Sequence, residues 1–101
     1  MRILLRVTFP HEPFNGFVKD GSVSGKMMRI INEQKPEAAY FTEFDGRRTA
    51  ILIVNMEEAS RIPAIAEPWF LTFNADVEFR PTMVPEDLAK SGLDTLGKKW
   101  A

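Results

Sequence analysis

The chain has 101 residues, of which 45% are hydrophobic and 27% are charged, and its formal net charge is −1. This length and balance are typical of one globular domain, so we expect a single domain over residues 1–101. The chain contains no cysteine, which excludes disulfide bonds, thiolate zinc sites and cysteine nucleophiles. Its lysines and arginines are scattered, so no basic surface for nucleic acid is expected.

No segment has the pattern of a targeting or membrane sequence. Arg6 follows an apolar run that is too short for the core of a signal peptide. No apolar run approaches the length needed to cross a bilayer. We therefore expect a soluble, cytoplasmic protein without a membrane partner.

The first third of the chain predicts a strand followed by a helix. Side chains alternate over residues 2–9, and two nearby prolines end this strand. A helix is expected from about residue 13 to residue 34, before the next proline. A bend near Gly21 stays open, because glycine lowers helix propensity.

Asp45-Gly46 gives the strongest local signal in the chain. A two-residue type I′ turn needs positive φ at both positions, which aspartate tolerates and glycine accepts freely. The turn joins strands expected over residues 38–44 and 47–56, both rich in β-branched and aromatic residues. With this turn Glu43 faces Arg48, so we expect an ion pair at the end of the hairpin.

The second half predicts a helix, a strand and a short helix. The helix is expected to begin near Ser60, and Pro68 should kink or end it. The last strand is expected over residues 75–83. Pro85 opens a short helix within a C-terminal extension over residues 84–101, and we expect the remainder of that extension to be a tail.

The order β-α-β-β-α-β predicts an α+β fold, a ferredoxin-like sandwich whose antiparallel-dominated four-stranded sheet has strand order 4-1-3-2. Both helices then cover one face of the sheet, and the short C-terminal helix is an addition. A contiguous apolar patch on the bare face usually marks an interface. We therefore expect a homodimer that packs sheet against sheet, through the candidate interface residues Leu4, Tyr40, Phe44, Ile51 and Ile53.

Segments 4–11 (LLRVTFPH) and 67–70 (EPWF), the latter leading into 75–79 (ADVEF), resemble the dimeric α+β barrel superfamily. This superfamily includes muconolactone isomerase-like proteins, small antibiotic-biosynthesis-type monooxygenases and many uncharacterised members. The resemblance implies a dimer and a ligand pocket between the helices and the sheet or at the barrel's mouth. The resemblance does not place the isomerase's catalytic residues one by one on this sequence, so none is carried over and catalytic residues stay unknown. No metal or cofactor is expected.

Three residues with both apolar and polar character are candidates to line a pocket. His11 is the only histidine, and it directly follows the first strand, where a general acid or base could act near neutral pH. Its alternative is a surface or helix-capping role. Tyr40 and Trp69 combine an apolar ring with a hydrogen-bonding tip, and the alternative for both is the core or an interface.

Charged side chains on the bare face form the second group of candidates. Arg2 and Arg6 of the first strand should interleave with Asp76, Glu78 and Arg80 of the last strand. Arg6, Glu78 and Arg80 are candidates for a pocket wall that grips the carboxylate of a small organic acid. The alternative is an ion-pair cluster at the interface or at the sheet edge.

Two classes of function stay open. The chain could bind or transform a small organic acid or aromatic ligand without a metal, as the resemblance implies. Alternatively, it could be a non-catalytic dimeric module, structural or regulatory, whose bare sheet face serves only assembly. An RNA-recognition domain shares the same element order, but the third strand lacks the aromatics that such a domain needs. Whether the protein is an enzyme is left uncertain.

Overall fold

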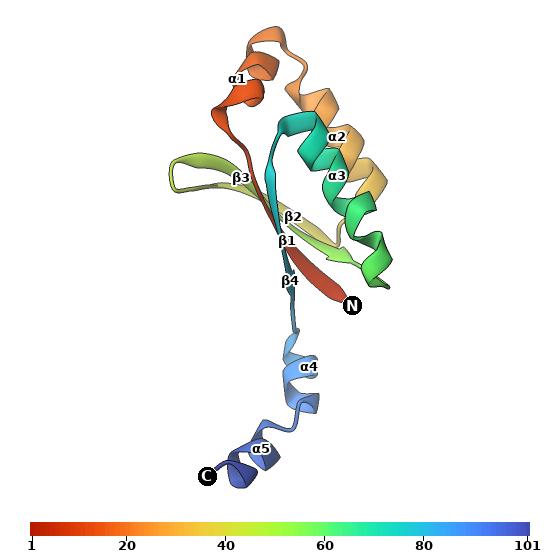
Figure 1. Ribbon diagram of the computed structural model, residues 1–101, viewed down its shortest axis with the longest axis vertical. Coiled ribbons are helices and arrows are strands. Elements are labelled where there is room, and N and C mark those ends of the chain that lie inside the picture. Colours follow the sequence, from red (N-terminus) through yellow and green to blue (C-terminus); the bar gives the residue numbers. More distant parts are fainter.

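The structure is a computed structural model that describes residues 1–101. Its elements, in chain order, are β1 (Arg2–Thr8), α1 (His11–Asp20), α2 (Val23–Gln34), β2 (Ala38–Phe44), β3 (Arg47–Asn55), the 3-10 turn η1 (Ala59–Arg61), α3 (Ile62–Phe73), β4 (Asp76–Pro81), α4 (Pro85–Lys90) and α5 (Leu93–Lys99). Helices α1, α2 and α3 lie on one side of the sheet, while α4 and α5 project from its end (Figure 1). The α+β class is confirmed.

The four strands form one antiparallel sheet in the order β2-β3-β1-β4, which reads 4-1-3-2 from the opposite edge. The hairpin register places Tyr40 opposite Ile51 and Glu43 opposite Arg48, as the sequence predicts. Asp45 has φ 52° and Gly46 has φ 77°, the positive values that a two-residue type I′ turn requires. The arrangement is consistent with a ferredoxin-like sandwich.

The core lies between the sheet and the three covering helices. It is built from alternate residues of the central strands β1 and β3, because successive side chains of a strand point to opposite faces. An aromatic cluster joins sheet to helix: the ring centroids of Phe9 and Phe73 lie 5.1 Å apart, and those of Phe9 and Trp69 lie 6.0 Å apart. The buried core residues of the two strands are Ile3, Leu5, Val7, Ala50, Leu52 and Val54.

The first helical segment is broken, which settles the bend that the sequence left open. Gly21 has φ 80° and ends α1, while the N–H of Ser22 donates to the carbonyl of Phe17 at 2.9 Å. A left-handed residue at this position closes the helix and starts the chain in a new direction. Glycine adopts that conformation without steric cost.

Helix α3 continues through Pro68, so of the two outcomes expected for this proline, a kink or an end, the end is wrong. The helix continues to Phe73, and Asn74, with φ 55°, closes it. Trp69 and Phe73, which follow the proline, are fully buried. Burial of two large aromatic side chains offsets the hydrogen bond that proline cannot donate.

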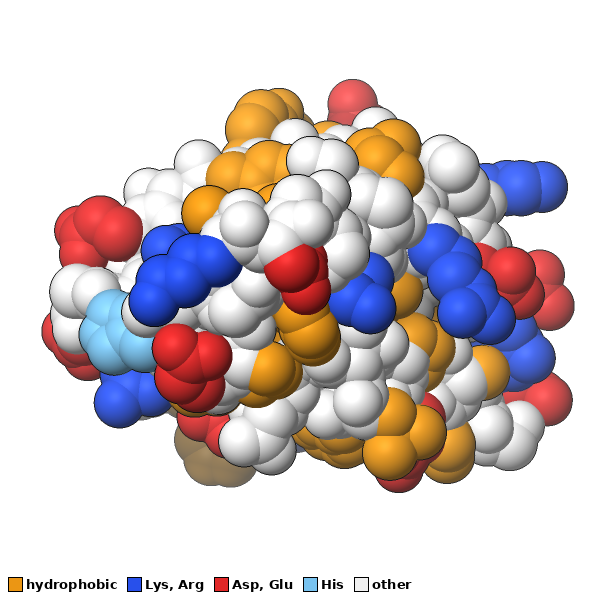
Figure 2. All heavy atoms as spheres, turned by 90° about the horizontal axis from the view of Figure 1, so that it is seen from above, with side chains coloured by type: hydrophobic (Ala, Val, Ile, Leu, Met, Phe, Trp, Pro, Cys, Tyr) orange, Lys and Arg blue, Asp and Glu red, His pale blue; other side chains and the backbone are white.

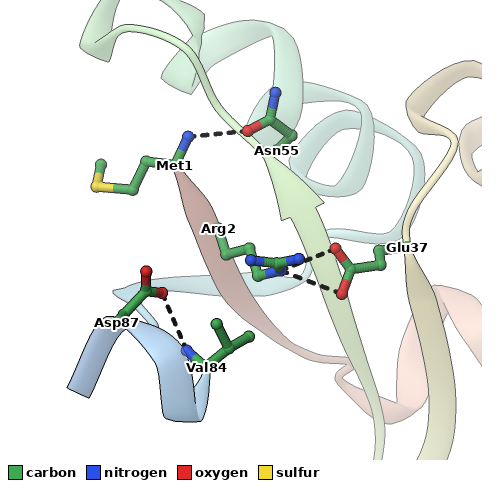
Figure 3. A network of polar contacts seen from close by, with 6 residues as sticks. All are labelled: Met1, Arg2, Glu37, Asn55, Val84 and Asp87. Carbon is green, nitrogen blue, oxygen red and sulfur yellow. Dashed lines mark hydrogen bonds and ion pairs between the residues drawn. The ribbon is translucent and has the colours of Figure 1, made fainter. Parts of the chain in front are cut away.

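The C-terminal extension is helical beyond Gly92, where the sequence predicted a tail. We call residues 82–101 the C-terminal arm. Helix α4 begins where the Val84 N–H donates to the Asp87 side chain at 3.1 Å (Figure 3). Gly92, with φ 74°, separates α4 from α5. The arm lengthens the molecule to 59 Å along its longest axis, against 28 and 19 Å along the others.

Truncating Leu52 to alanine should lower the free energy of unfolding by about 2–5 kcal/mol, because this fully buried side chain would leave a cavity. Urea denaturation measures the change. The matched control is Leu71→Ala, since Leu71 is 81% exposed. The control should stay within about 0.5 kcal/mol of the parent chain. Equal losses for the two variants would contradict the assignment of the core.

Candidate functional site

The sheet face that no helix covers, which we call the open sheet face, carries a partly exposed apolar patch. Leu4, Ile51 and Ile53 are half-buried on it. Tyr40 and Phe44 on the neighbouring strand β2 are 64% and 43% exposed. These five residues are the interface candidates that the sequence indicated.

A charged cluster lies beside this apolar patch. The Nε of Arg6 donates to Oε2 of Glu78, and Nη1 of Arg80 lies 3.6 Å from the same oxygen. The guanidinium carbon of Arg6 is 4.0 Å from the centre of the Phe44 ring, a cation–π contact. The Arg6 side chain is thus restrained by an ion pair with Glu78 and by stacking on Phe44. Arg2, which the sequence grouped with these charges, pairs instead with Glu37 at 2.9 Å (Figure 3).

The Arg6 contact lowers the pKa of Glu78. The hydrogen bond from Arg6 is the largest cause, opposed by desolvation and assisted by the charges of Arg6 and Arg80. Glu78 therefore stays ionised over the neutral range and is poorly suited to act as a general acid. The cluster behaves as an ion-pair network rather than as a proton donor.

A second candidate site, which we call the hairpin pocket, opens between the β2–β3 hairpin and the first two helices. Its volume is about 390 Å³. Three phenylalanines line it, and Arg48 is the one charged residue among its lining residues, which are Phe9, Phe14, Met27, Phe41, Thr42, Arg48 and Thr49. The hydroxyl of Thr49 donates to the Arg47 carbonyl at 3.1 Å, so this buried polar group is satisfied.

Arg48 is held at the pocket without a carboxylate partner. Its Nη1 donates to Oδ1 of Asn15 at 2.7 Å, and its guanidinium carbon lies 4.5 Å from the centre of the Phe14 ring. The expected ion pair with Glu43 does not form, although the two residues face each other in the ladder. Glu43 instead accepts the N–H of Gly46 at 3.0 Å, across the turn. Arg48 therefore lies at the pocket with neutral neighbours and no acidic partner.

The other predicted pocket residues do not come together. His11 is exposed at the start of α1, and Figure 2 shows the single histidine at the surface among charged side chains. Tyr40 lies on the open sheet face. Trp69 is fully buried in the core, where its Nε1 donates to Oε1 of Gln34 at 3.2 Å. None of the three lines the hairpin pocket.

Sequence reasoning missed the residues that do line this pocket. Phe14 and Phe41 carried no signal of a ligand site, since aromatic residues on a helix and a strand are usually core. The predicted ion pair between Arg48 and Glu43 rested on the strand register alone. The position of Glu43 beside the turn could have indicated that Arg48 is unpaired. A carboxylate close to a tight turn can accept the turn's free N–H instead of pairing with an arginine.

Two larger hollows lie elsewhere. One runs between α2 and α3, with a volume of about 710 Å³. The other, of about 790 Å³, lies at the base of the C-terminal arm around Arg2, Glu37, Asn55 and Asp87 (Figure 3). No group of three or more histidine, aspartate or glutamate side chains is arranged to hold a metal ion. No helix combines the length and apolar character needed to cross a membrane.

Comparison with known protein families and with curated proteins finds no match for this chain. Evidence about function therefore comes from the geometry of the open sheet face and of the hairpin pocket.

Replacing Glu78 with glutamine tests the charged cluster through pH. Because the folded pKa of Glu78 is lowered, its contribution to stability is present above its unfolded pKa of about 4.5 and is lost as the pH falls through the folded pKa. Glu78→Gln should therefore be less stable than the parent at pH 7, and the difference should shrink in acid. Urea midpoints measured from pH 7 down to about pH 2 give the two curves.

The matched control for this prediction is Glu57→Gln. Glu57 is exposed and forms no ion pair or side-chain hydrogen bond. Its substitution should leave the acid profile of the parent unchanged. A Glu78→Gln variant that is as stable as the parent at every pH would show that the Arg6 contact does not form in solution.

Proposed function

We propose that this protein binds a small aromatic carboxylate in the hairpin pocket. The observation that carries the proposal is Arg48, a guanidinium without an acidic partner at the edge of a cavity walled by phenylalanine rings. A volume of about 390 Å³ is of the size that small ligands occupy. The proposal makes the protein a binding protein, because no general acid or base lines the pocket.

The chemistry of the pocket favours an aromatic acid over a purely apolar ligand. An arginine fork pairs with a carboxylate through two parallel hydrogen bonds. The aromatic ring of the ligand can stack edge-to-face against Phe14 and Phe41. Asn15 and Phe14 already restrain the Arg48 side chain, so less rotamer entropy is lost when the ligand binds.

The finer proposal for the fold is a dimeric α+β barrel, formed when two open sheet faces pack together. The apolar patch around Tyr40, Phe44 and Ile51 supports it, since a monomer gains nothing from exposing those side chains. Such packing would also place the paired charges of Arg6 and Glu78 inside the assembly, where a satisfied ion pair costs less than an unpaired charge.

A non-catalytic dimeric module remains the second candidate. Its support is Trp69, whose polar tip is satisfied inside the core and is not presented to a ligand. In that case the open sheet face serves assembly alone, and the hairpin pocket stays empty.

The Arg48→Met variant tests ligand binding, with benzoate and phenylacetate as probes in calorimetry and in amide NMR titration. Methionine keeps the apolar stem and removes the charge. Affinity should fall by about 10- to 100-fold, which corresponds to the loss of hydrogen bonds to a charged group. In the parent chain, the shifted amide signals should map to residues 9–14 and 41–49.

Arg47→Met is the matched control, because Arg47 is the neighbouring exposed arginine and does not line the pocket. It should bind the probes as the parent does. If the parent binds neither probe, or if the two variants lose affinity equally, the aromatic-acid proposal fails and the module becomes the better account.

Replacing Ile51 with lysine tests the sheet-to-sheet dimer. The new charge would lie in the apolar patch directly opposite Arg6 in the β1–β3 ladder, a like charge whose acidic neighbour Glu78 is already paired, so the two open sheet faces should separate and the dimer should dissociate. Light scattering coupled to gel filtration at micromolar concentration measures the mass. The control is Val18→Lys on α1, away from the sheet, which should stay dimeric. A parent chain that is monomeric under these conditions would contradict the proposed assembly.

A further inference from the structure

Asn15 of α1 fixes the position of the Arg48 side chain at the hairpin pocket. Its Oδ1 accepts a hydrogen bond from Nη1 of Arg48 at 2.7 Å, and Asn15 itself is half-buried. The ring of Phe14, the preceding residue, has its centre 4.5 Å from the guanidinium carbon. Two consecutive residues of one helix therefore restrain a side chain that comes from β3.

The contact with Asn15 leaves most of the guanidinium free to bind a ligand. The hydrogen bond uses one N–H group of Nη1, and neither Nε nor Nη2 donates to another group of the chain. A guanidinium can present two of its nitrogens side by side to both oxygens of a carboxylate. Asn15 thus restrains Arg48 without occupying the donors that recognise an anion.

The neutrality of Asn15 decides the charge of this site. An amide oxygen accepts a hydrogen bond but carries no formal charge, so Arg48 is positioned without an opposite charge. Glu43, which faces Arg48 in the ladder, accepts the N–H of Gly46 at 3.0 Å instead. An aspartate at position 15 would have nearly the shape of asparagine and would pair with Arg48 through its carboxylate. An amide at this position therefore gives an anion-binding pocket, and a carboxylate would give a neutral one.

We propose that Asn15 determines the charge selectivity of the hairpin pocket, so that the pocket takes aromatic acids that carry no amino group. This inference rests on the proposed function and narrows its ligand class. Arg48 supplies a positive charge for the carboxylate, whereas no acidic residue lines the pocket to receive an ammonium group. An aromatic amino acid would leave its ammonium group unpaired against apolar walls, which costs free energy.

Calorimetry at pH 7 with 3-phenylpropanoate and L-phenylalanine tests the ligand class. The two probes share a ring and a carboxylate and differ in one amino group. The parent chain should bind 3-phenylpropanoate about tenfold or more tightly, because the ammonium group of the amino acid loses water without gaining a partner. Equal affinities would overturn this inference, but they would leave the proposed binding of an aromatic carboxylate in place.

The Asn15→Asp variant of the full-length chain tests the role of the amide. Its new carboxylate should pair with Arg48 and weaken the binding of 3-phenylpropanoate by about 10- to 100-fold, which corresponds to the loss of hydrogen bonds to a charged group. The neutral alcohol 3-phenylpropan-1-ol reports on the apolar walls alone, so it should bind the parent and the variant equally. Loss of both probes would show that Asn15 shapes the walls and not the charge, and would overturn the inference.

Asn32→Asp is the matched control, because it makes the same change in charge elsewhere. Asn32 is exposed on α2 and does not line the hairpin pocket. This variant should bind 3-phenylpropanoate as the parent does. An equal loss of affinity in the two variants would assign the effect to the net charge of the chain and would overturn the role of Asn15.

A measurement without ligand separates the contact from the proposed function. The change in urea midpoint caused by Asn15→Asp is measured in the parent chain and in Arg48→Met. The change should be more favourable when Arg48 is present, because only then does the new carboxylate have a partner. The same change in both backgrounds would show that Asn15 does not position Arg48, and would overturn the inference whether or not the parent binds the probes. A parent chain that shows the coupling but binds no probe would instead overturn the proposed function, and the selectivity with it.

Discussion

The alternation of side chains along β1 is the constraint on which the rest of the structure depends. This strand is central in the sheet, and its odd-numbered residues Ile3, Leu5 and Val7 are buried under one layer of helices, as is Phe9 directly after the strand. Its even-numbered residues must therefore face the other side, where no helix lies. The open sheet face, with Leu4 and Arg6, is the direct geometrical consequence of a fold that has two layers instead of three.

Two arginines on the sheet illustrate how local competition decides the role of a charge. Arg6 is neutralised by Glu78 and stacked on Phe44, so its charge is used within the structure. Arg48 is restrained by Asn15 and Phe14, which are both neutral. Arg6 thus forms an ion pair on the open sheet face, whereas Arg48, on the helix-covered face, has no acidic partner. Only the second is suited to recognise an anion.

Patterns that repeat over several residues could be predicted from the sequence, and contacts that depend on one competing hydrogen bond could not. The hairpin register followed from Asp45-Gly46, because the turn type leaves one pairing available. The Glu43–Arg48 ion pair failed because the nearby N–H of Gly46 is a closer partner for the carboxylate. Trp69 resembled a pocket residue in the sequence, but its burial depends on Phe9, which is sixty residues away.

The break at Gly21 couples the two cavities that α1 and α2 line. Helix α1 contributes Phe14 to the hairpin pocket and Phe17 to the hollow between α2 and α3, while α2 contributes Met27 to the first and Ile30 to the second. Any change at Gly21 that turns one of these helices relative to the other therefore alters the walls of both cavities at once.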